Sequence, residues 1–176
     1  MTHPLQLHAE EKARAARRGY ASILPVPVEA IVKKYGIRTE LAPLDDELSG
    51  MSLIKDGVAV IVLNSVHHPN RRRFTLSHEL GHHLLHREYL TNNVHVDKVV
   101  LNRNEISSLA IDPKEMQANA FAAELLMPEA ELKRYRSIDL NDDEFVSQLA
   151  RKLKVSVTAL AYRLANLGVS HSAVGT

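Results

Sequence analysis

The stretch Thr75 to Glu88 reads TLSHELGHHLLHRE and concentrates four histidines and two glutamates among leucines. His78 and His82 are four residues apart, which on a helix corresponds to about one turn of rise and about 40° of rotation. Two imidazoles placed in this way can bind one ion, and zinc would hold each nitrogen at about 2.0–2.1 Å. The spacing therefore predicts a metal site on a helix.

Glu79 follows the first histidine of the pair and is turned from it by about 100°. In HExxH zinc peptidases the residue in this position is the general base, and the two histidines are ligands. A structural zinc site has no use for such a base, so Glu79 favours catalysis. His82 and His86 form a rival pair with the same spacing, but no glutamate follows His82.

A zinc site of this kind needs a third protein ligand. One extended form of the motif places a glycine seven residues and a histidine ten residues after the first histidine, and Leu85 and Glu88 at these positions exclude it. The later segment PKEMQANAFAAELLMP offers Glu115 and Glu124 instead. On a helix, Glu115 lies at the edge of an apolar face among alanines that would let another helix approach, and Glu124 points roughly the opposite way.

Glu115 also has a competing interpretation as a helix cap. It lies three residues after Asp112, which is the capping-box position at a helix N-terminus. A buried carboxylate needs a compensating partner, however, and a metal ion would serve. The sequence favours Glu115 as the third ligand.

Two motifs together resemble the ImmA/IrrE metallopeptidase family. The first is HELGH at 78–82, and the second, longer and more specific, is E-x-x-A-N-x-F-A-A-E-L-L-M-P at 115–128. PVPVEAIVKKYGI near the start and VSVTALAYRLANLG near the end also fit the family pattern, so the resemblance covers most of the chain.

The resemblance implies His78, His82 and Glu115 as ligands of one zinc ion per chain and Glu79 as the catalytic residue. It implies a minimal zincin-like fold and a cytoplasmic endopeptidase. Family members typically cleave a helix-turn-helix repressor or antitoxin partner, which relieves repression in mobile elements or stress responses. Related enzymes often add a residue that stabilises the oxyanion. The candidates here stay open and are His83, Tyr135, Tyr162 and Arg163.

The pattern of helix and strand signals along the chain predicts an α+β class. Helices are expected at 7–22, 27–36, from Pro69 to about Arg87, at 112–128, 142–153 and 157–167, and strands of a small antiparallel sheet at 37–44, 48–56 and 57–64. Residues 88–111 indicate a loop, with a short helix near 104–110. The expected domains are a zincin-like domain at 1–130 and a helix-turn-helix-like hairpin at 131–176, packed on the first.

Composition is consistent with a soluble protein. The 22 Lys and Arg residues almost balance the 21 Asp and Glu residues, so no global basic field suggests nucleic acid or membrane as the main partner. Cysteine is absent, which excludes disulfides and thiolate metal sites. We expect neither a signal peptide nor a membrane-spanning segment, because the longest apolar run is GVAVIVL at 57–63.

Three functions remain open at this level. The first is a zinc endopeptidase acting on a repressor or antitoxin, the second a DNA-binding or protein-binding regulator with a non-catalytic metal site, and the third a structural zinc protein. The hairpin favours packing or substrate docking over DNA binding, because between 157 and 168 Arg163 is the one basic residue. The run Arg71 to Arg73 indicates a solvated helix face rather than a phosphate site.

Overall fold

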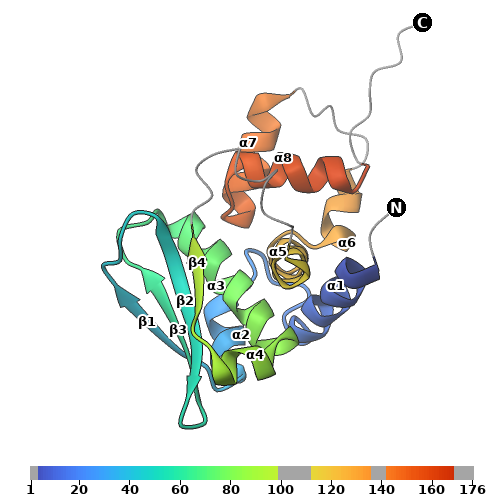
Figure 1. Ribbon diagram of the computed structural model, residues 1–176. Coiled ribbons are helices and arrows are strands. Elements are labelled where there is room, and N and C mark those ends of the chain that lie inside the picture. The colour runs from blue at the N-terminus through green and yellow to red at the C-terminus, as the bar shows by residue number, and fades with distance from the viewer. Residues whose placement is uncertain (1–3, 99–111, 136–141, 169–176) are drawn as a thin grey trace, which may run out of the picture.

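The computed structural model describes residues 4–98, 112–135 and 142–168, and it has the predicted α+β fold (Figure 1). The strands are β1 (Arg38–Ala42), β2 (Leu48–Lys55), β3 (Val58–Asn64) and β4 (His95–Lys98). The helices are α1 (Pro4–Ala16), α2 (Val28–Lys34), α3 (Pro69–Leu85), α4 (Arg87–Asn92), α5 (Pro113–Leu126), α6 (Glu129–Leu132), the 3-10 helix η1 (Lys133–Tyr135), α7 (Asp143–Leu153) and α8 (Val157–Asn166). In Figure 1 the sheet lies on one side, α5 and α1 lie on the other, and α3 runs between them.

The sheet is mixed, with strand order β1-β3-β2-β4. β2 and β3 form the predicted antiparallel hairpin, whose turn uses positive φ at Asp56 and Gly57. β1 instead pairs in parallel with β3, so the sheet is not purely antiparallel as expected. Fully buried Asn64 holds the connection from β1 to β2, because its side chain accepts from the Leu44 N–H and donates to the Leu48 carbonyl.

Helix α3 is buried over its central turns, where Thr75 to His83 are all inaccessible. One side packs on β2 and β3, and another packs on α5. A helix between two layers has little solvent-facing surface, which explains why its polar histidines lie inside the protein. The metal motif therefore occupies an interior position.

Gly81 allows α5 to approach α3 closely. A β-carbon at this position would lie 3.3 Å from the Ala118 Cα and 3.2 Å from the ring of Phe121. Helix axes come nearest where small residues face each other. The glycine within the HELGH motif and the alanines of α5 therefore set the distance between the two helices.

Most predicted elements are present within two or three residues, and two regions differ. The first helix ends at Ala16 rather than at 22, and Gly19 follows with φ of 96°. The supposed loop after residue 88 contains most of α4 and the strand β4. The short helix expected near 104–110 lies outside the described residues.

Capping residues set the ends of α5 and α8. Asp112 accepts a hydrogen bond from the Lys114 N–H at 2.8 Å, and Pro113 is the first residue of α5. Ser156 accepts from the Ala159 N–H at the start of α8, and Gly168 has φ of 65° just after its end. These local signals fix where the helices that carry Glu115 and Arg163 begin.

The arginines at 71–73 do more than form a solvated face. Arg72 donates to the Ser65 carbonyl and Arg73 to the Val26 carbonyl. Both side chains are half-buried, and Arg71, which is exposed, donates to the hydroxyl of Ser49. The expectation of a solvated run is therefore wrong for two of the three arginines, because they tie the start of α3 to neighbouring loops.

The helical hairpin α7–α8 is joined to the rest of the protein by an apolar core and by a buried ion cluster. Leu149, Leu160 and Leu164 belong to the same hydrophobic cluster as Leu80 and Phe121. Beside it, the buried guanidinium of Arg163 pairs with Glu10 of α1 at 2.9 Å and with Glu124 of α5, and it donates to the Met127 carbonyl. One side chain of α8 thus links three helices.

None of the helices in the three described ranges is both long and apolar enough to cross a membrane. A cytoplasmic location and a domain boundary near residue 130 stay predictions.

We expect Arg163→Ala to lower the free energy of unfolding by about 3–5 kcal/mol, because it leaves two buried carboxylates without their shared cation. Urea denaturation monitored by circular dichroism measures the change. Arg134→Ala is the control, since Arg134 is 72% exposed in its pair with Glu131 and should contribute less than about 1 kcal/mol. Equal destabilisation by the two variants would contradict the role given to the cluster.

Candidate metal centre

The Nε2 atoms of His78 and His82 converge beside α3. The two nitrogens are 3.0 Å apart, and both rings are buried. The rings meet edge to face, with centroids 4.7 Å apart. The i, i+4 spacing therefore produces the convergence expected from the sequence.

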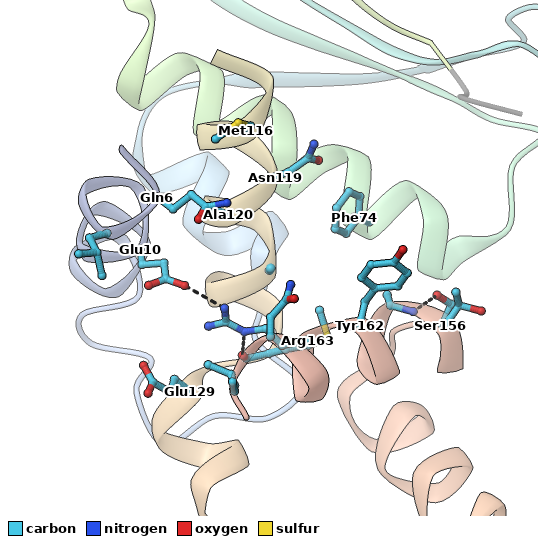
Figure 2. Close-up of a pocket in the computed structure, with 17 residues that line it drawn as sticks. Gln6, Glu10, Phe74, Met116, Asn119, Ala120, Glu129, Ser156, Tyr162 and Arg163 are labelled. Carbon is cyan, nitrogen blue, oxygen red and sulfur yellow. Dashed lines mark hydrogen bonds and ion pairs between the residues drawn. The ribbon is translucent and has the colours of Figure 1, made fainter. Parts of the chain in front are cut away.

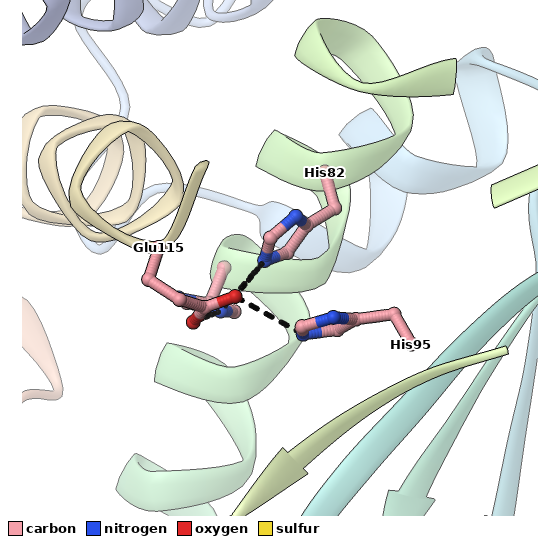
Figure 3. A group of neighbouring side chains, drawn as sticks. His82, His95 and Glu115 are labelled. Atoms are coloured by element: carbon pink, nitrogen blue, oxygen red, sulfur yellow. Dashed lines mark hydrogen bonds and ion pairs between the residues drawn. The ribbon is translucent and has the colours of Figure 1, made fainter. Parts of the chain in front are cut away.

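Glu115 of α5 reaches both histidines, and Figure 3 shows its carboxylate directed at His82. Its Oε2 lies 3.3 Å from the His78 Nε2, and its Oε1 lies 3.3 Å from the His82 Nε2. The capping interaction of this helix comes from Asp112, which leaves the Glu115 carboxylate turned toward α3. In a tetrahedral zinc site with bonds of about 2.0–2.1 Å, donor atoms lie about 3.3 Å apart. The three donors fit that geometry.

His95 of β4 is a fourth residue at this site, and sequence reasoning missed it. Its Nε2 is 3.6 Å from the Glu115 Oε1, and its ring centroid is 4.0 Å from that of His82. One donor atom from each of His78, His82, His95 and Glu115 lies within 4.8 Å of every other. The signal that could have found it is the alternation of apolar and polar residues in VHVD, which is typical of a strand.

A second layer of polar side chains orients the two histidines of α3. The Nδ1 of His78 is 3.0 Å from the Asn119 Oδ1, which suits donation from His78 when its Nε2 binds a metal. The Nδ1 of His82 faces His86 at 3.1 Å, and the Nε2 of His86 faces the Gln117 Oε1 at 3.0 Å. His86, the rival ligand of the sequence analysis, therefore lies behind His82 and outside the group of donors. α5 therefore supplies one donor atom of the site, from Glu115, and two of the side chains behind the histidines, Gln117 and Asn119.

Glu79 lies beside the donor group and is fully buried. Among the residues that the structure describes, neither carboxylate oxygen has a hydrogen-bond partner, and the Nε2 of His95, 3.9 Å from the Glu79 Oε1, has none either. Such orphaned polar atoms are rare in protein interiors and indicate a missing ion, water or substrate group. The residues present therefore fit a bound metal ion with a base next to it.

Charge coupling in the site shifts several pKa values. Burial alone would lower the pKa of His78, but the carboxylates of Glu115, Glu79 and Asp97 raise it to about 9. Burial lowers the pKa of His82 to about 4. Burial raises the pKa of Glu79 to about 8 against the opposing charge of His78. In the metal-free protein, protonated His78 therefore supplies positive charge next to the carboxylates of Glu79 and Glu115.

Glu115 has the opposite shift from Glu79. Burial alone would raise its pKa, but contacts with His78 and His82 hold the pKa well below its usual range. Glu115 is thus ionised across the physiological pH range, as a metal ligand must be.

The other residues named from the sequence lie elsewhere. Glu124 is buried on the far side of α5 in the ion cluster with Arg163, as its helical position predicted. Arg163 is therefore engaged away from the donor group. The Tyr162 side chain is 69% exposed, and Tyr135 packs on Phe145 with ring centroids 5.8 Å apart.

His83, the fourth oxyanion candidate, is buried on α3 next to His82. It does not belong to the group of converging donor atoms in the described part of the chain. His95, by contrast, has an Nε2 that faces both Glu79 and Glu115 and makes no hydrogen bond within the described ranges.

Proteins similar to this chain include a relative from a phage and a solved structure. Over 139 residues the chain is 28% identical to Uncharacterized immunity region protein 2 of Bacillus phage phi105, a match that covers 72% of the chain and 82% of that protein. A Mycobacterium tuberculosis transcriptional regulator superposes with a TM-score of 0.56 and 17% identity over 93% of this chain. The chain spans about half of that regulator (47%), and the likeness concerns the fold alone.

The family comparison covers the site itself. Residues 32–165 match the model described as Peptidase_M78, the IrrE N-terminal-like domain. This range contains the HELGH motif, β4 with His95, and α5 with Glu115. The resemblance seen in the sequence is therefore confirmed, and the chain belongs to the IrrE N-terminal-like Peptidase_M78 family of metallopeptidases.

Proposed function

We propose that this protein is a zinc-dependent endopeptidase that cleaves a helix-turn-helix transcriptional repressor or antitoxin and so relieves repression. The observation that carries the proposal is the buried Glu79 carboxylate beside converging histidines and Glu115, with no hydrogen-bond partner in the described part of the chain. The printed name of the phage relative refers to an immunity region, which supports a regulatory role.

In this proposal His78, His82 and Glu115 hold the zinc ion, and Asn119 and His86 orient the two imidazoles. Bound zinc supplies a Lewis acid that polarises the scissile carbonyl and acidifies a water molecule. Glu79 takes a proton from the attacking water and passes it to the leaving amine nitrogen. Its buried carboxylate, whose pKa is raised by burial, is a stronger base than a solvated one.

We assign His95 to substrate activation rather than to a fourth ligand. A fourth protein ligand would close the coordination shell and leave no position for water, as in structural zinc sites. The Nε2 of His95 lies 3.9 Å from the Glu79 Oε1 and 3.6 Å from the Glu115 Oε1, and it makes no hydrogen bond to any residue that the structure describes. From there it can donate a hydrogen bond to the carbonyl oxygen of the substrate as negative charge develops on it.

The alternative is a DNA-binding or protein-binding regulator with a metal site that does not catalyse. The structural neighbour is named a transcriptional regulator, which keeps this alternative open. The hairpin disfavours direct DNA binding. Arg163 is the single basic residue of α8, and it is buried in the ion cluster and cannot contact a phosphate.

The proposal predicts that Glu79→Gln retains about one zinc per chain but slows cleavage by at least about 100-fold, because the general base is gone. The substrate to test is a helix-turn-helix protein encoded next to this chain. Its cleavage is monitored by gel electrophoresis and mass spectrometry. Glu88→Gln, an exposed change on α4, is the matched control and should cleave normally. Glu115→Ala should lose zinc. Undiminished cleavage by Glu79→Gln would refute the mechanism.

For His95 we expect His95→Ala to keep zinc and to lower kcat by about 100- to 1,000-fold, the usual effect of removing one oxyanion donor. His95→Gln, which retains an N–H donor, should recover part of the loss. Zinc content is read by atomic absorption and kcat with the same substrate. Loss of zinc from His95→Ala, to the extent seen for His78→Ala, would instead make His95 a ligand.

Zinc affinity should rise with pH between about 6 and 9, by up to about tenfold per unit. His78 is protonated below its pKa of about 9, so zinc must displace that proton, and the competition weakens as pH rises. His82, with a pKa of about 4, adds nothing in this range. Competition with a chromophoric chelator, corrected for the chelator's own protonation, measures the slope. A flat profile would show that His78 carries no proton in the metal-free protein.

A further inference from the structure

A groove runs between the first turns of α3 and the hairpin α7–α8. Its volume is about 910 Å³, and we call it the hairpin groove. Its apolar lining comes from Phe74, Ala150, Val155, Val157 and Ala159. The size suits several side chains of a peptide rather than one small group.

The walls of the hairpin groove are fixed to each other. The side chain of Asn70 at the start of α3 donates to the Val155 carbonyl in the turn between α7 and α8 at 3.1 Å. The Arg163 cluster holds the far end of α8 on α1 and α5. A groove with such walls needs little rearrangement to receive a partner.

The rim of the groove carries exposed positive charge. Arg71 and Arg151 line it, and both are exposed. Within the described ranges neither forms an ion pair, although Arg71 donates to the Ser49 hydroxyl and its charge acts at longer range on the Asp97 carboxylate. Lys152 and Lys154 follow directly at the end of α7. An apolar floor with a cationic rim complements a segment that has apolar side chains flanked by acidic ones.

The groove leads toward the metal centre along α3. Phe74 lines it, and the Phe74 ring centroid is 6.4 Å from that of His78. Arg71 precedes His78 by seven residues, which is about 10 Å of helix. An extended peptide covers that distance with about three residues.

A second cavity of about 980 Å³ lies on the other side of Phe74, between α1, α5 and α8 (Figure 2). Its charged lining residues are already paired: Glu10 binds Arg163, and Glu129 binds Lys133. It therefore lacks the free cations that distinguish the hairpin groove.

We propose that the hairpin groove docks an acidic, apolar-bearing segment of the protein substrate, about three or four residues from the peptide bond to be cleaved. This proposal rests on the proposed function and adds to it the chemistry by which the substrate is selected. The basic rim attracts the segment electrostatically, and the apolar floor holds it in register with Glu79.

The test uses the zinc-loaded Glu79→Gln protein, so that binding is measured without cleavage. The probes are three fluorescein-labelled synthetic peptides that share the same apolar residues and differ in the flanking residues, which are Glu, Gln or Lys. Binding is measured by fluorescence anisotropy. We expect the Glu peptide to bind at least about tenfold more tightly than the Lys peptide, and the difference to shrink as salt is added.

Two further variants, made in the same background, locate the binding surface. Arg151→Glu should weaken binding of the Glu peptide by at least about tenfold and favour the Lys peptide. Val157→Glu, at a position 47% exposed, places a carboxylate in the groove and should also repel the Glu peptide. Arg18→Glu, at an exposed position outside the groove, is the matched control and should bind normally.

Equal binding of the three peptides, or equal loss in Arg18→Glu and Arg151→Glu, would overturn the proposal. So would a labelled DNA duplex that binds more tightly than every peptide and is released by Arg151→Glu, since the rim would then serve nucleic acid. Because the readout is binding to a variant without its base, absence of cleavage in the wild-type protein would refute the proposed function and leave this result intact.

Discussion

The close packing of α3 on α5 is the contact on which the metal centre depends. Gly81 faces Ala118 and Phe121, and the absence of a β-carbon there lets the two helices meet. Glu115 lies one turn before Ala118 on α5, and His78 and His82 flank Gly81 on α3. A larger side chain at Gly81 would push the two helices apart. Glu115 would then move away from His78 and His82, and its 3.3 Å contacts with them would lengthen. The glycine thus contributes geometry to the site, although it costs about 1 kcal/mol of helix stability relative to alanine.

This packing also buries charge that the protein alone does not balance. Glu79 and Glu115 face the same small space as three histidines, and His82 and His95 have pKa values lowered chiefly by burial. A proton on His78 is a weaker counterion than a divalent cation, because it supplies one positive charge where the cation supplies two. A cation among the donor atoms would satisfy Glu115 directly and orient a water molecule toward Glu79. The electrostatics and the geometry therefore favour the same occupant.

The sequence predicted the parts of the site that lie on helices with strong local signals. His78, Glu79 and His82 lie within one motif. Asp112 and Pro113 mark the start of α5, and the helical positions counted from there predict that Glu115 lies on the buried side. His95 was missed because its strand has four residues and draws its stability from pairing with β2 rather than from local preference. The parallel pairing of β1 with β3 was missed for a related reason. It joins residues far apart in the sequence, such as Arg38 and Val60, which no local pattern reveals, and the Asn64 side chain holds the loop that follows β1.

Glu115 and Glu124 show how one helix can serve two different interactions. They are nine residues apart, which on a helix places them on nearly opposite sides. Glu115 faces α3 and the histidines, whereas Glu124 faces α1 and α8 and binds Arg163. α5 therefore connects the candidate metal centre to the hairpin that forms one wall of the groove. The position of this one helix must satisfy two sets of contacts at once, those of Glu115 with the histidines of α3 and those of Glu124 with Arg163 of α8.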